Sequence, residues 1–191
     1  MLSDIDSANN LVELFLKRAD EKGDLPFLGA KLGGVWQTIS WSAAAEQVCL
    51  LAESLRELGL KNGDRICLVA ENRPEWCIAD LAIMAAGCIT VPTYITNTER
   101  DHVHILDNSG AKAVIVSTEK LLRPLHGALQ ATGVAEHVIG IDDLHRQQSG
   151  SFAYHKWDRM LEGDAIAARR AVDERISRIG RGDTACIIYT S

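Results

Sequence analysis

Short apolar runs that alternate with helical segments occupy the middle of this chain. Each run is apolar at successive positions instead of at every second one. Strands that are covered on both faces of a parallel sheet have this pattern, whereas a strand with one wet face alternates apolar and polar residues. The runs are residues 65–70, 88–91, 113–116 and 137–141. We therefore expect an α/β fold with a layered, mostly parallel sheet that has helices on both faces.

The first part of the chain adds a hairpin and two helices. Residues 9–22 carry apolar side chains at helical spacing and end before a glycine. A Gly-Gly pair separates two strand-like segments, residues 27–32 and 35–39, and predicts an N-terminal β-hairpin because glycine tolerates the positive φ angles of a tight turn. Ser42 is placed to cap a long helix. The buried stripe of that helix is expected to contain Val48, Leu51, Ala52, Leu55 and Leu58.

A second long helix is expected to begin near Pro74, with two candidates for its cap. Asn72 is one candidate, since Glu75 is placed to complete a capping box with it. Arg73 is the other, because proline disfavours helical geometry in the residue before it. The body of the helix, residues 77–86, is apolar nearly all round, which predicts burial between two layers.

Several polar segments are interpreted as helix ends and solvent-exposed surface. Thr98 is expected to cap a helix over residues 99–106, and the Asp-Asn-Ser-Gly sequence at 107–110 predicts a turn. Residues 142–155 are polar and contain glycine, which is typical of a surface connection. The arginines of residues 165–179 alternate with acidic residues and predict a solvated helix face.

Composition narrows the class of protein and its partners. The formal net charge is −6, so a nucleic acid or an anionic membrane surface is not expected as the main partner. The five cysteines lie inside apolar runs without a Cys-x-x-Cys pair, which predicts buried, reduced thiols in a cytoplasmic protein. The first residues lack the pattern of a secretion signal, and residues 76–86 are too short an apolar stretch to span a bilayer. Any membrane contact is therefore expected to be peripheral.

The histidines do not form a recognisable metal motif. His102 and His104 are two positions apart, so they point away from each other on the predicted helix and are expected to be surface residues. If this segment were a strand, both would share a face, and a metal site there would be worth testing. The remaining histidines, His126, His137, His145 and His155, lack the spacing of zinc ligands.

The last residues form an apolar segment that leads into two hydroxyl side chains. Residues 185–189 predict a strand, and Thr190 and Ser191 follow it. Many α/β proteins bind phosphate where a strand ends, through backbone N–H groups and hydroxyls of the following loop. Taken alone, the pattern is weak, because a strand that leaves a core through Thr-Ser is common.

Five segments together resemble one family. They are residues 63–65, 71–76, 85–88, 91–94 and 107–116. They are similar to the N-terminal region of AMP-binding, adenylate-forming enzymes, and the closest likeness is to bacterial long-chain fatty acyl-CoA synthetases. In that family a strand that ends in Tyr-Thr-Ser opens a glycine-rich phosphate loop, and Tyr189, Thr190 and Ser191 fall in register with its start. The resemblance implies that Thr190 and Ser191 bind the cofactor, that the Thr190 hydroxyl lies near the ATP phosphates or their Mg²⁺, and that no catalytic residue lies in this chain.

The resemblance also implies how the chain relates to a whole enzyme. Residues 1–191 would be a partial N-terminal AMP-binding domain, truncated at the start of the phosphate loop, with the C-terminal domain absent. In the full-length ligase a fatty acid carboxylate attacks the α-phosphorus of ATP, giving an acyl-adenylate and pyrophosphate, and the thiol of coenzyme A then displaces AMP. Since the rest of the phosphate loop and the C-terminal catalytic lysine are missing, the chain alone is expected to be inactive.

Two other interpretations stay open at this point. The chain could instead be a non-catalytic α/β module that binds a nucleotide or a partner. A divergent dinucleotide-binding domain is less well supported, because no Gly-x-Gly-x-x-Gly sequence follows a strand. If the terminal strand belongs to a larger sheet, its open edge predicts a homo-oligomer or a frayed C-terminus for this chain.

Overall fold

A five-stranded parallel sheet lies at the centre of the chain, as the apolar runs predict. The computed structural model describes residues 7–144 and 152–190. The strands lie in the order β4-β3-β5-β6-β7, and every neighbouring pair is parallel. Their bounds are β3 Arg65–Val69, β4 Ile89–Pro92, β5 Ala113–Val116, β6 His137–Gly140 and β7 Ala153–Lys156.

The strand order places a reversal of winding in the middle of the sheet. From β3 the chain moves outward to β4, then crosses back over β3 to β5 and continues through β6 to β7. The direction of winding therefore reverses between β3 and β5. In open α/β sheets, ligands bind in the crevice at the carboxyl ends of the strands where such a reversal occurs. This edge of the sheet is where a functional site is expected.

Both faces of the sheet are covered by helices, which confirms the predicted layers. Along β3, Ile66 and Leu68 join one apolar cluster, while Cys67 and Val69 join the other. Successive side chains of a strand point to opposite faces, so a run that is apolar at every position needs cover on both. The first face is covered by α3 (Trp41–Glu57) and α4 (Pro74–Ala85), and the second by α5 (Glu99–Ser109) and α6 (Glu119–Thr132).

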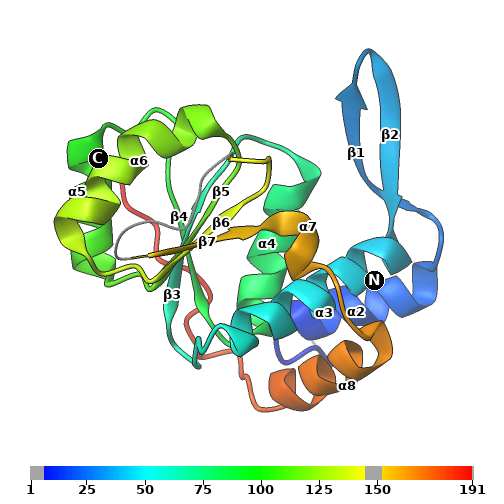
Figure 1. Cartoon of the computed structure of the whole chain (residues 1–191). Helices are drawn as coiled ribbons and strands as arrows, with labels where there is room; N and C mark the ends of the chain where they lie inside the picture. Colours follow the sequence, from blue (N-terminus) through cyan, green and yellow to red (C-terminus); the bar gives the residue numbers. More distant parts are fainter. Residues whose placement is uncertain (1–6, 145–151, 191) are drawn as a thin grey trace.

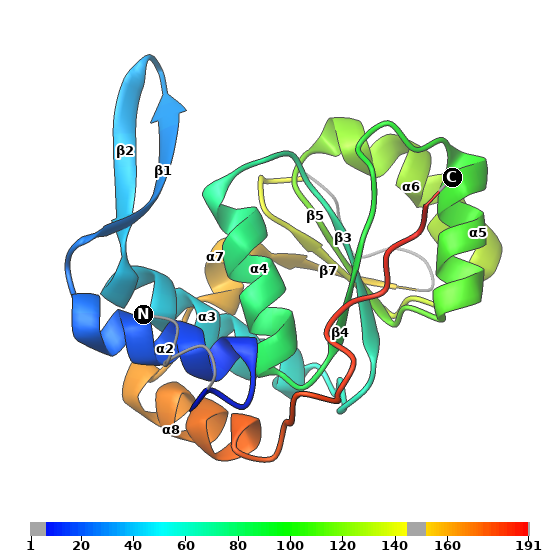
Figure 2. The ribbon, with the colours of Figure 1, turned by 180° about the vertical axis from the view of Figure 1, so that it is seen from behind.

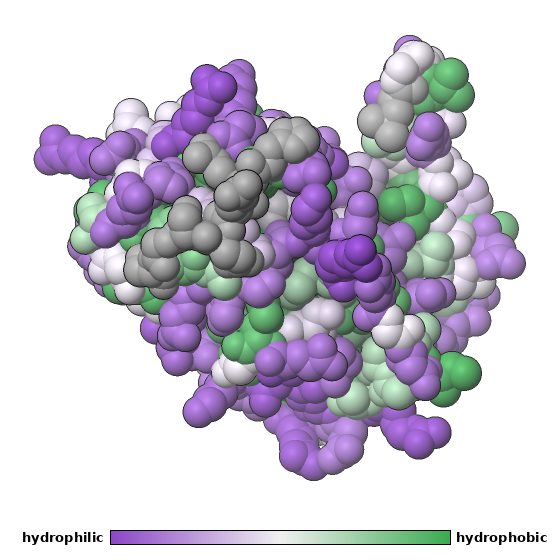
Figure 3. Space-filling model, in the orientation of Figure 1, coloured by the Kyte–Doolittle hydropathy of each residue, from purple (hydrophilic) through white to green (hydrophobic). Residues whose placement is uncertain are grey.

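Three more helices pack outside α3, and the predicted hairpin projects from the body. The helices are α2 (Leu11–Lys22), α7 (Trp157–Met160) and α8 (Ala165–Ile176). The antiparallel hairpin, β1 (Pro26–Leu32) and β2 (Val35–Ser40), extends away from them in Figures 1 and 2. Trp36 on it is 70% exposed, and Figure 3 shows further apolar surface on the hairpin and below its base. Among residues 7–144 and 152–190, no helix combines the length and the apolar character that a membrane crossing needs.

The structure identifies the caps of α3 and α4. The predicted Ser42 cap is wrong: the Ser40 hydroxyl accepts the N–H of Ala43 at 3.1 Å, and Ser42 lies inside the first turn. At α4 the second candidate is the observed one, since Arg73 has the extended N-cap backbone and Pro74 is the first helical residue. Proline fits this place because the first N–H groups of a helix have no intrahelical partner.

Helix α5 is longer than the sequence pattern predicts. The Thr98 cap is confirmed, and Asp101 completes a capping box with it. The predicted turn at 107–110 is wrong, because the helix continues to Ser109, whose hydroxyl donates to the Ile105 carbonyl at 2.6 Å. Gly110 then ends the helix with a left-handed φ of 59°. The Asp-Asn-Ser-Gly sequence therefore forms a helix C-terminus and its glycine cap.

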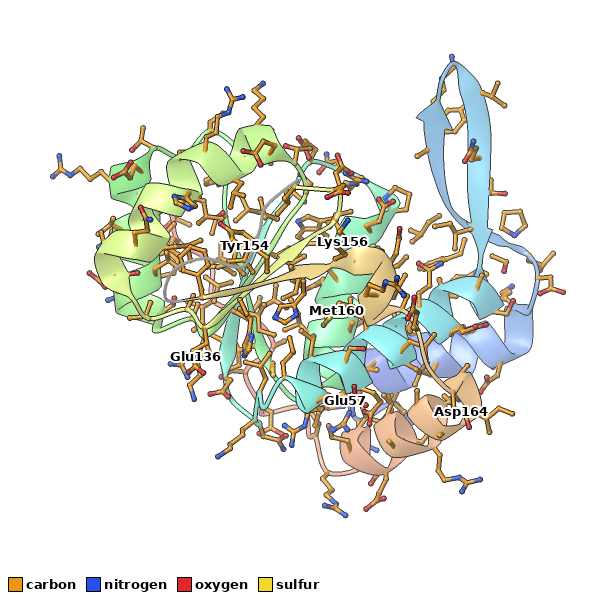
Figure 4. All side chains as sticks on the ribbon, in the orientation of Figure 1. Glu57, Glu136, Tyr154, Lys156, Met160 and Asp164 are labelled. Carbon is orange, nitrogen blue, oxygen red and sulfur yellow. The ribbon has the colours of Figure 1, made fainter. Side chains whose placement is uncertain are left out.

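Strand β7 lies within the segment that predicts a surface connection, so that interpretation is wrong for Ala153–Lys156. Residues 145–151 of the same segment lie outside the described residues. Figure 4 labels Tyr154 and Lys156 on the strand and Met160 on α7, which follows it directly. Tyr154 packs against the second apolar cluster, and the Met160 carbonyl accepts a hydrogen bond from the Ser54 hydroxyl of α3.

The arginines of α8 do not all face solvent, which corrects the predicted solvated face. Arg169 forms a bidentate pair with Asp20 of α2, with distances of 2.9 and 2.8 Å. Arg175 donates to Glu53 of α3 at 2.6 Å and to the Ala85 carbonyl at the end of α4 at 3.0 Å. Two arginines of one helix therefore fix it to three others, and the surrounding acidic residues are partners from those helices as well as from α8.

His102 is also misplaced by the sequence pattern, because its side chain is buried, with 2% exposure, while His104 is exposed. Burial lowers the pKa of His102 below its usual value of 6.5. The folded chain therefore favours the neutral imidazole.

Acidification is expected to destabilise the chain through His102. The unfolded residue takes up a proton near pH 6.5, whereas the folded one does so only at lower pH. The contribution of His102 to the free energy of unfolding is therefore complete above pH 6.5, and it is lost as the pH falls toward the pKa of the folded state. Chemical denaturation between pH 7.5 and 5 gives the free energy of unfolding as a function of pH. Its slope against pH should be smaller in His102→Gln than in the parent chain, and the exposed His104→Gln is the control. Burial lowers the pKa of His155 too, so part of the slope will remain.

Candidate functional site

The terminal segment runs beside β4 but does not form the predicted strand. One parallel bridge joins Cys186 to Thr90. There, the Thr90 N–H donates to the Ala185 carbonyl at 3.0 Å, and the Ile187 N–H donates to the Thr90 carbonyl at 2.9 Å. Ile188 is 63% exposed, because the outer side of the segment faces no described part of the chain. The segment runs parallel to β4, and Figure 2 shows it in red as it passes β4 and ends beside α5.

The prediction that all five cysteines are buried is wrong for two of them. Cys49, Cys67 and Cys88 are buried as predicted, whereas Cys77 is half-buried and Cys186 is exposed. Burial raises the pKa of Cys67 to about 12, so this thiol is held in its protonated, unreactive form. Cys186 differs because it lies on the terminal segment, at the open edge of the sheet.

Tyr189 anchors the end of the terminal segment on α5. Its hydroxyl donates to Asn108 Oδ1 at 2.7 Å, and its ring meets the ring of His104 edge-on at a centroid distance of 6.0 Å. Ile187 and Tyr189 also pack against the second apolar cluster. Two side chains of the segment therefore face inward, and Thr190 comes next along the chain as an exposed residue.

Polar side chains meet at the carboxyl ends of β3 and β5, where the winding reverses. The Ser117 hydroxyl, which follows β5, donates to the Glu71 carboxylate, which follows β3. Arg73 pairs with Glu75 at 2.7 Å and with Asp142 at 3.0 Å. The hydrogen bond with Glu75 raises the pKa of Arg73. The polar groups named here are therefore hydrogen-bonded to one another. The Arg73 guanidinium is already shared between the Glu75 and Asp142 carboxylates.

Nearly the whole chain matches one protein family. The family described as "AMP-binding enzyme" matches residues 15–191, which is nearly the whole chain. The chain belongs to this family. The resemblance found in the sequence is therefore confirmed.

Similar members of the AMP-binding enzyme family are much longer than this chain. The long-chain-fatty-acid–CoA ligase FadD15 of Mycobacterium tuberculosis (strain ATCC 25618 / H37Rv) is 29% identical over 185 residues, which are 96% of this chain and 29% of the relative. The long-chain-fatty-acid–CoA ligase ACSBG2 of Xenopus laevis is 25% identical over 183 residues, which are 94% of this chain and 24% of the relative. The chain thus spans less than a third of these proteins.

Solved structures share the fold. A mutant form of Coronafacic Acid Ligase from Pectobacterium brasiliense superposes with a TM-score of 0.71 at 17% identity, over 92% of this chain and 32% of that one. The anthranilate CoA ligase AuaEII, solved in complex with anthranoyl-AMP, gives a TM-score of 0.69 at 16% identity, over 83% of this chain and 29% of that one. The mostly parallel α/β architecture is therefore the fold of the AMP-binding enzyme family.

The structure describes one of the two residues that the resemblance assigns to the cofactor. Thr190 is exposed at the end of the terminal segment, and Ser191 lies outside the described residues. In residues 7–144 and 152–190, no group of three or more histidine, cysteine or acidic side chains is placed to hold a metal ion. Thr190 offers a single hydroxyl, so the described residues do not by themselves fit Mg²⁺ or a triphosphate.

Two polar contacts of the sheet have no signal in the sequence pattern. One is the Glu71–Ser117 pair described above, whose members are 46 positions apart. The other joins His137 Nδ1 of β6 to His155 Nε2 of β7 at 3.1 Å. Both depend on which strands are neighbours. A position directly after an apolar run is the only local sign that Glu71 and Ser117 lie at one edge of the sheet.

Proposed function

We propose that this chain forms the N-terminal part of the AMP-binding domain of an ATP-dependent ligase that joins a long-chain fatty acid to coenzyme A. The observation that carries the proposal is the path of the terminal segment, which runs parallel to β4 and leads toward Thr190. Membership of the AMP-binding enzyme family supports the adenylate-forming reaction. The names of FadD15 and ACSBG2 support a long-chain fatty acid as the substrate.

In this proposal the chain supplies a scaffold and the first residues of a phosphate loop. The Thr190 hydroxyl would donate a hydrogen bond to a phosphate oxygen or would be one ligand of Mg²⁺, and Ser191 would belong to the same loop. The reaction brings a carboxylate to the phosphates of ATP, so cationic groups and N–H donors must surround the leaving phosphates. Bound Mg²⁺ would neutralise part of that charge. Because the Arg73 guanidinium is already paired with Glu75 and Asp142, Arg73 is not expected to be one of these cationic groups.

The experiment that tests the proposal compares the chain with a completed enzyme. The purified chain, incubated with ATP, Mg²⁺, a long-chain fatty acid and coenzyme A, is expected to form no acyl-CoA. The chain is then placed in FadD15 in exchange for the region that it matches, and we call this protein the joined ligase. The joined ligase is expected to catalyse fatty-acid-dependent exchange of pyrophosphate into ATP.

The outcomes separate the ligase from a non-catalytic module. Acyl-CoA formation by the chain alone would contradict a partial domain. A joined ligase that folds but exchanges no pyrophosphate with long-chain, short-chain or aryl acids, while FadD15 is active, would favour the module. Activity with short or aryl acids alone would retain the adenylate-forming reaction and reject the long-chain assignment.

A further inference from the structure

Among residues 7–144 and 152–190, the backbone of the sheet holds the terminal segment through one residue, Thr90. The two backbone hydrogen bonds of the segment both involve Thr90, and they reach no further along the chain than Ile187. In the described part of the chain, no backbone hydrogen bond joins residues 188–190 to other residues. Ile188 is mostly exposed and provides no anchor. The position of Thr190 must therefore depend on Tyr189, the residue before it.

Helix α5 provides the contact for Tyr189 through two side chains of one face. His104 and Asn108 are four positions apart, so they lie one turn apart on the same side of the helix. The Tyr189 ring packs against His104, and its hydroxyl donates to Asn108 Oδ1. The helix itself is held at its start by the capping box of Thr98 and Asp101. The Tyr189 ring is thus held against α5, a helix that is capped at both ends.

We propose that the Tyr189–Asn108 hydrogen bond is a latch that positions Thr190 for the nucleotide, and that both residues are positioning residues. The effect on the nucleotide rests on the proposed function, whereas the hydrogen bond itself belongs to this chain and can be tested without the ligase. Consecutive Cα atoms are about 3.8 Å apart, so a fixed Tyr189 leaves Thr190 one peptide unit of freedom. A loose Tyr189 would free all residues after Ile187.

The latch can be tested in the chain itself by hydrogen exchange followed by mass spectrometry. Tyr189→Phe removes only the hydroxyl, and Asn108→Ala removes the side-chain amide that carries the acceptor Oδ1. Each is expected to speed exchange of the Ile187 N–H, which donates to the Thr90 carbonyl, by about five-fold, the effect of one net hydrogen bond. The exchange is followed in a peptide that begins before residue 185, because a peptide loses the label at its own first residues. Asn108→Asp keeps an acceptor oxygen and should restore slow exchange. Asp107→Ala, an exposed neighbour on α5, is the control.

A loss of helix stability would give a different pattern from a loss of the latch. Alanine has a higher helix propensity than asparagine, so Asn108→Ala should not lower the melting temperature of the chain. Faster exchange confined to the peptide that contains Ile187, with the peptides of α5 unchanged, supports the latch. Unchanged exchange of this peptide in both variants, or faster exchange throughout α5, would overturn it.

The joined ligase adds a readout that a purely structural role would not change. Tyr189→Phe and Asn108→Ala should each lower kcat/KM for ATP by about five-fold, and the double variant should be no worse than either single one. Asn108→Asp should restore the parental value. Independent, additive losses would overturn the latch. If the unsubstituted joined ligase shows no exchange, the proposed function fails, and the hydrogen-exchange result still decides the latch.

Discussion

Replacing Thr190 by valine is expected to lower pyrophosphate exchange by the joined ligase by about 100- to 1,000-fold, the usual loss when one donor to developing negative charge is removed. Valine has nearly the shape of threonine and the same β-branch, so the backbone keeps its preference while the hydroxyl is lost. Thr190 is exposed in the described chain and has no role in the core. The effect should therefore appear in catalysis and not in the melting temperature.

Two further variants identify the hydroxyl as the cause. Thr190→Ser restores a hydroxyl on a smaller side chain and should recover most of the lost rate. Thr184→Val changes an exposed threonine at the start of the same segment and should retain the parental rate. A Thr190→Val enzyme with parental activity would show that the hydroxyl is not used. Equal losses in the valine and serine variants would point to the shape of the loop instead.

The sequence pattern predicts the strands that are apolar throughout and misses β7, for a physical reason. Strands β3, β5 and β6 each have a neighbour on both sides and helices on both faces, so nearly all their residues are apolar. Strand β7 has the sequence Ala-Tyr-His-Lys, and within the described residues it pairs with β6 on one side and with no strand on the other. An edge strand in contact with solvent has no need of a continuous apolar run, and its sequence is then similar to that of a loop.

The helix ends and the buried histidine show a second limit. The sequence at 107–110 predicts a turn because Asp, Asn, Ser and Gly all favour turns. The same residue types also end helices, and the backbone hydrogen bond from the Gly110 N–H to the Leu106 carbonyl shows that the helix continues here. His102 is buried because of the way α5 packs on the sheet and on α6, and a three-dimensional contact of this kind leaves no trace in the spacing of histidines.

The candidate site could be predicted only where one segment carries it. The apolar pattern of residues 185–189 places the terminal segment beside the sheet, although the segment forms one bridge with β4 and not a strand. The role of Thr190 stays a prediction that depends on the family resemblance. The Glu71–Ser117 pair requires β3 and β5 to be neighbours, although β4 lies between them in the chain. Strand order is set by crossover connections, and no periodicity in the sequence encodes it.

Replacing Arg175 by methionine is expected to destabilise the chain by about 2 kcal/mol, the usual cost of losing hydrogen bonds to a charged group. Only 15% of the Arg175 side chain is exposed, and its partners are the Glu53 carboxylate and the Ala85 carbonyl. Methionine keeps the apolar stem but leaves both acceptors without their donor. For a chain of this size the melting temperature should fall by about 4–8 °C.

Arg178 provides a matched control for Arg175 on the next turn of the chain. Its side chain is 73% exposed and pairs with an equally exposed Glu174, so Arg178→Met should change stability by less than about 0.5 kcal/mol. In the Arg175→Met background, Glu53→Gln should cost less than it does alone, since the carboxylate has already lost its partner. Equal melting temperatures for Arg175→Met and Arg178→Met would contradict the argument. Because α8 leads directly into the segment that ends at Thr190, a loosened α8 should also speed amide exchange in residues 177–184, and this links the stability of the helix to the position of the site.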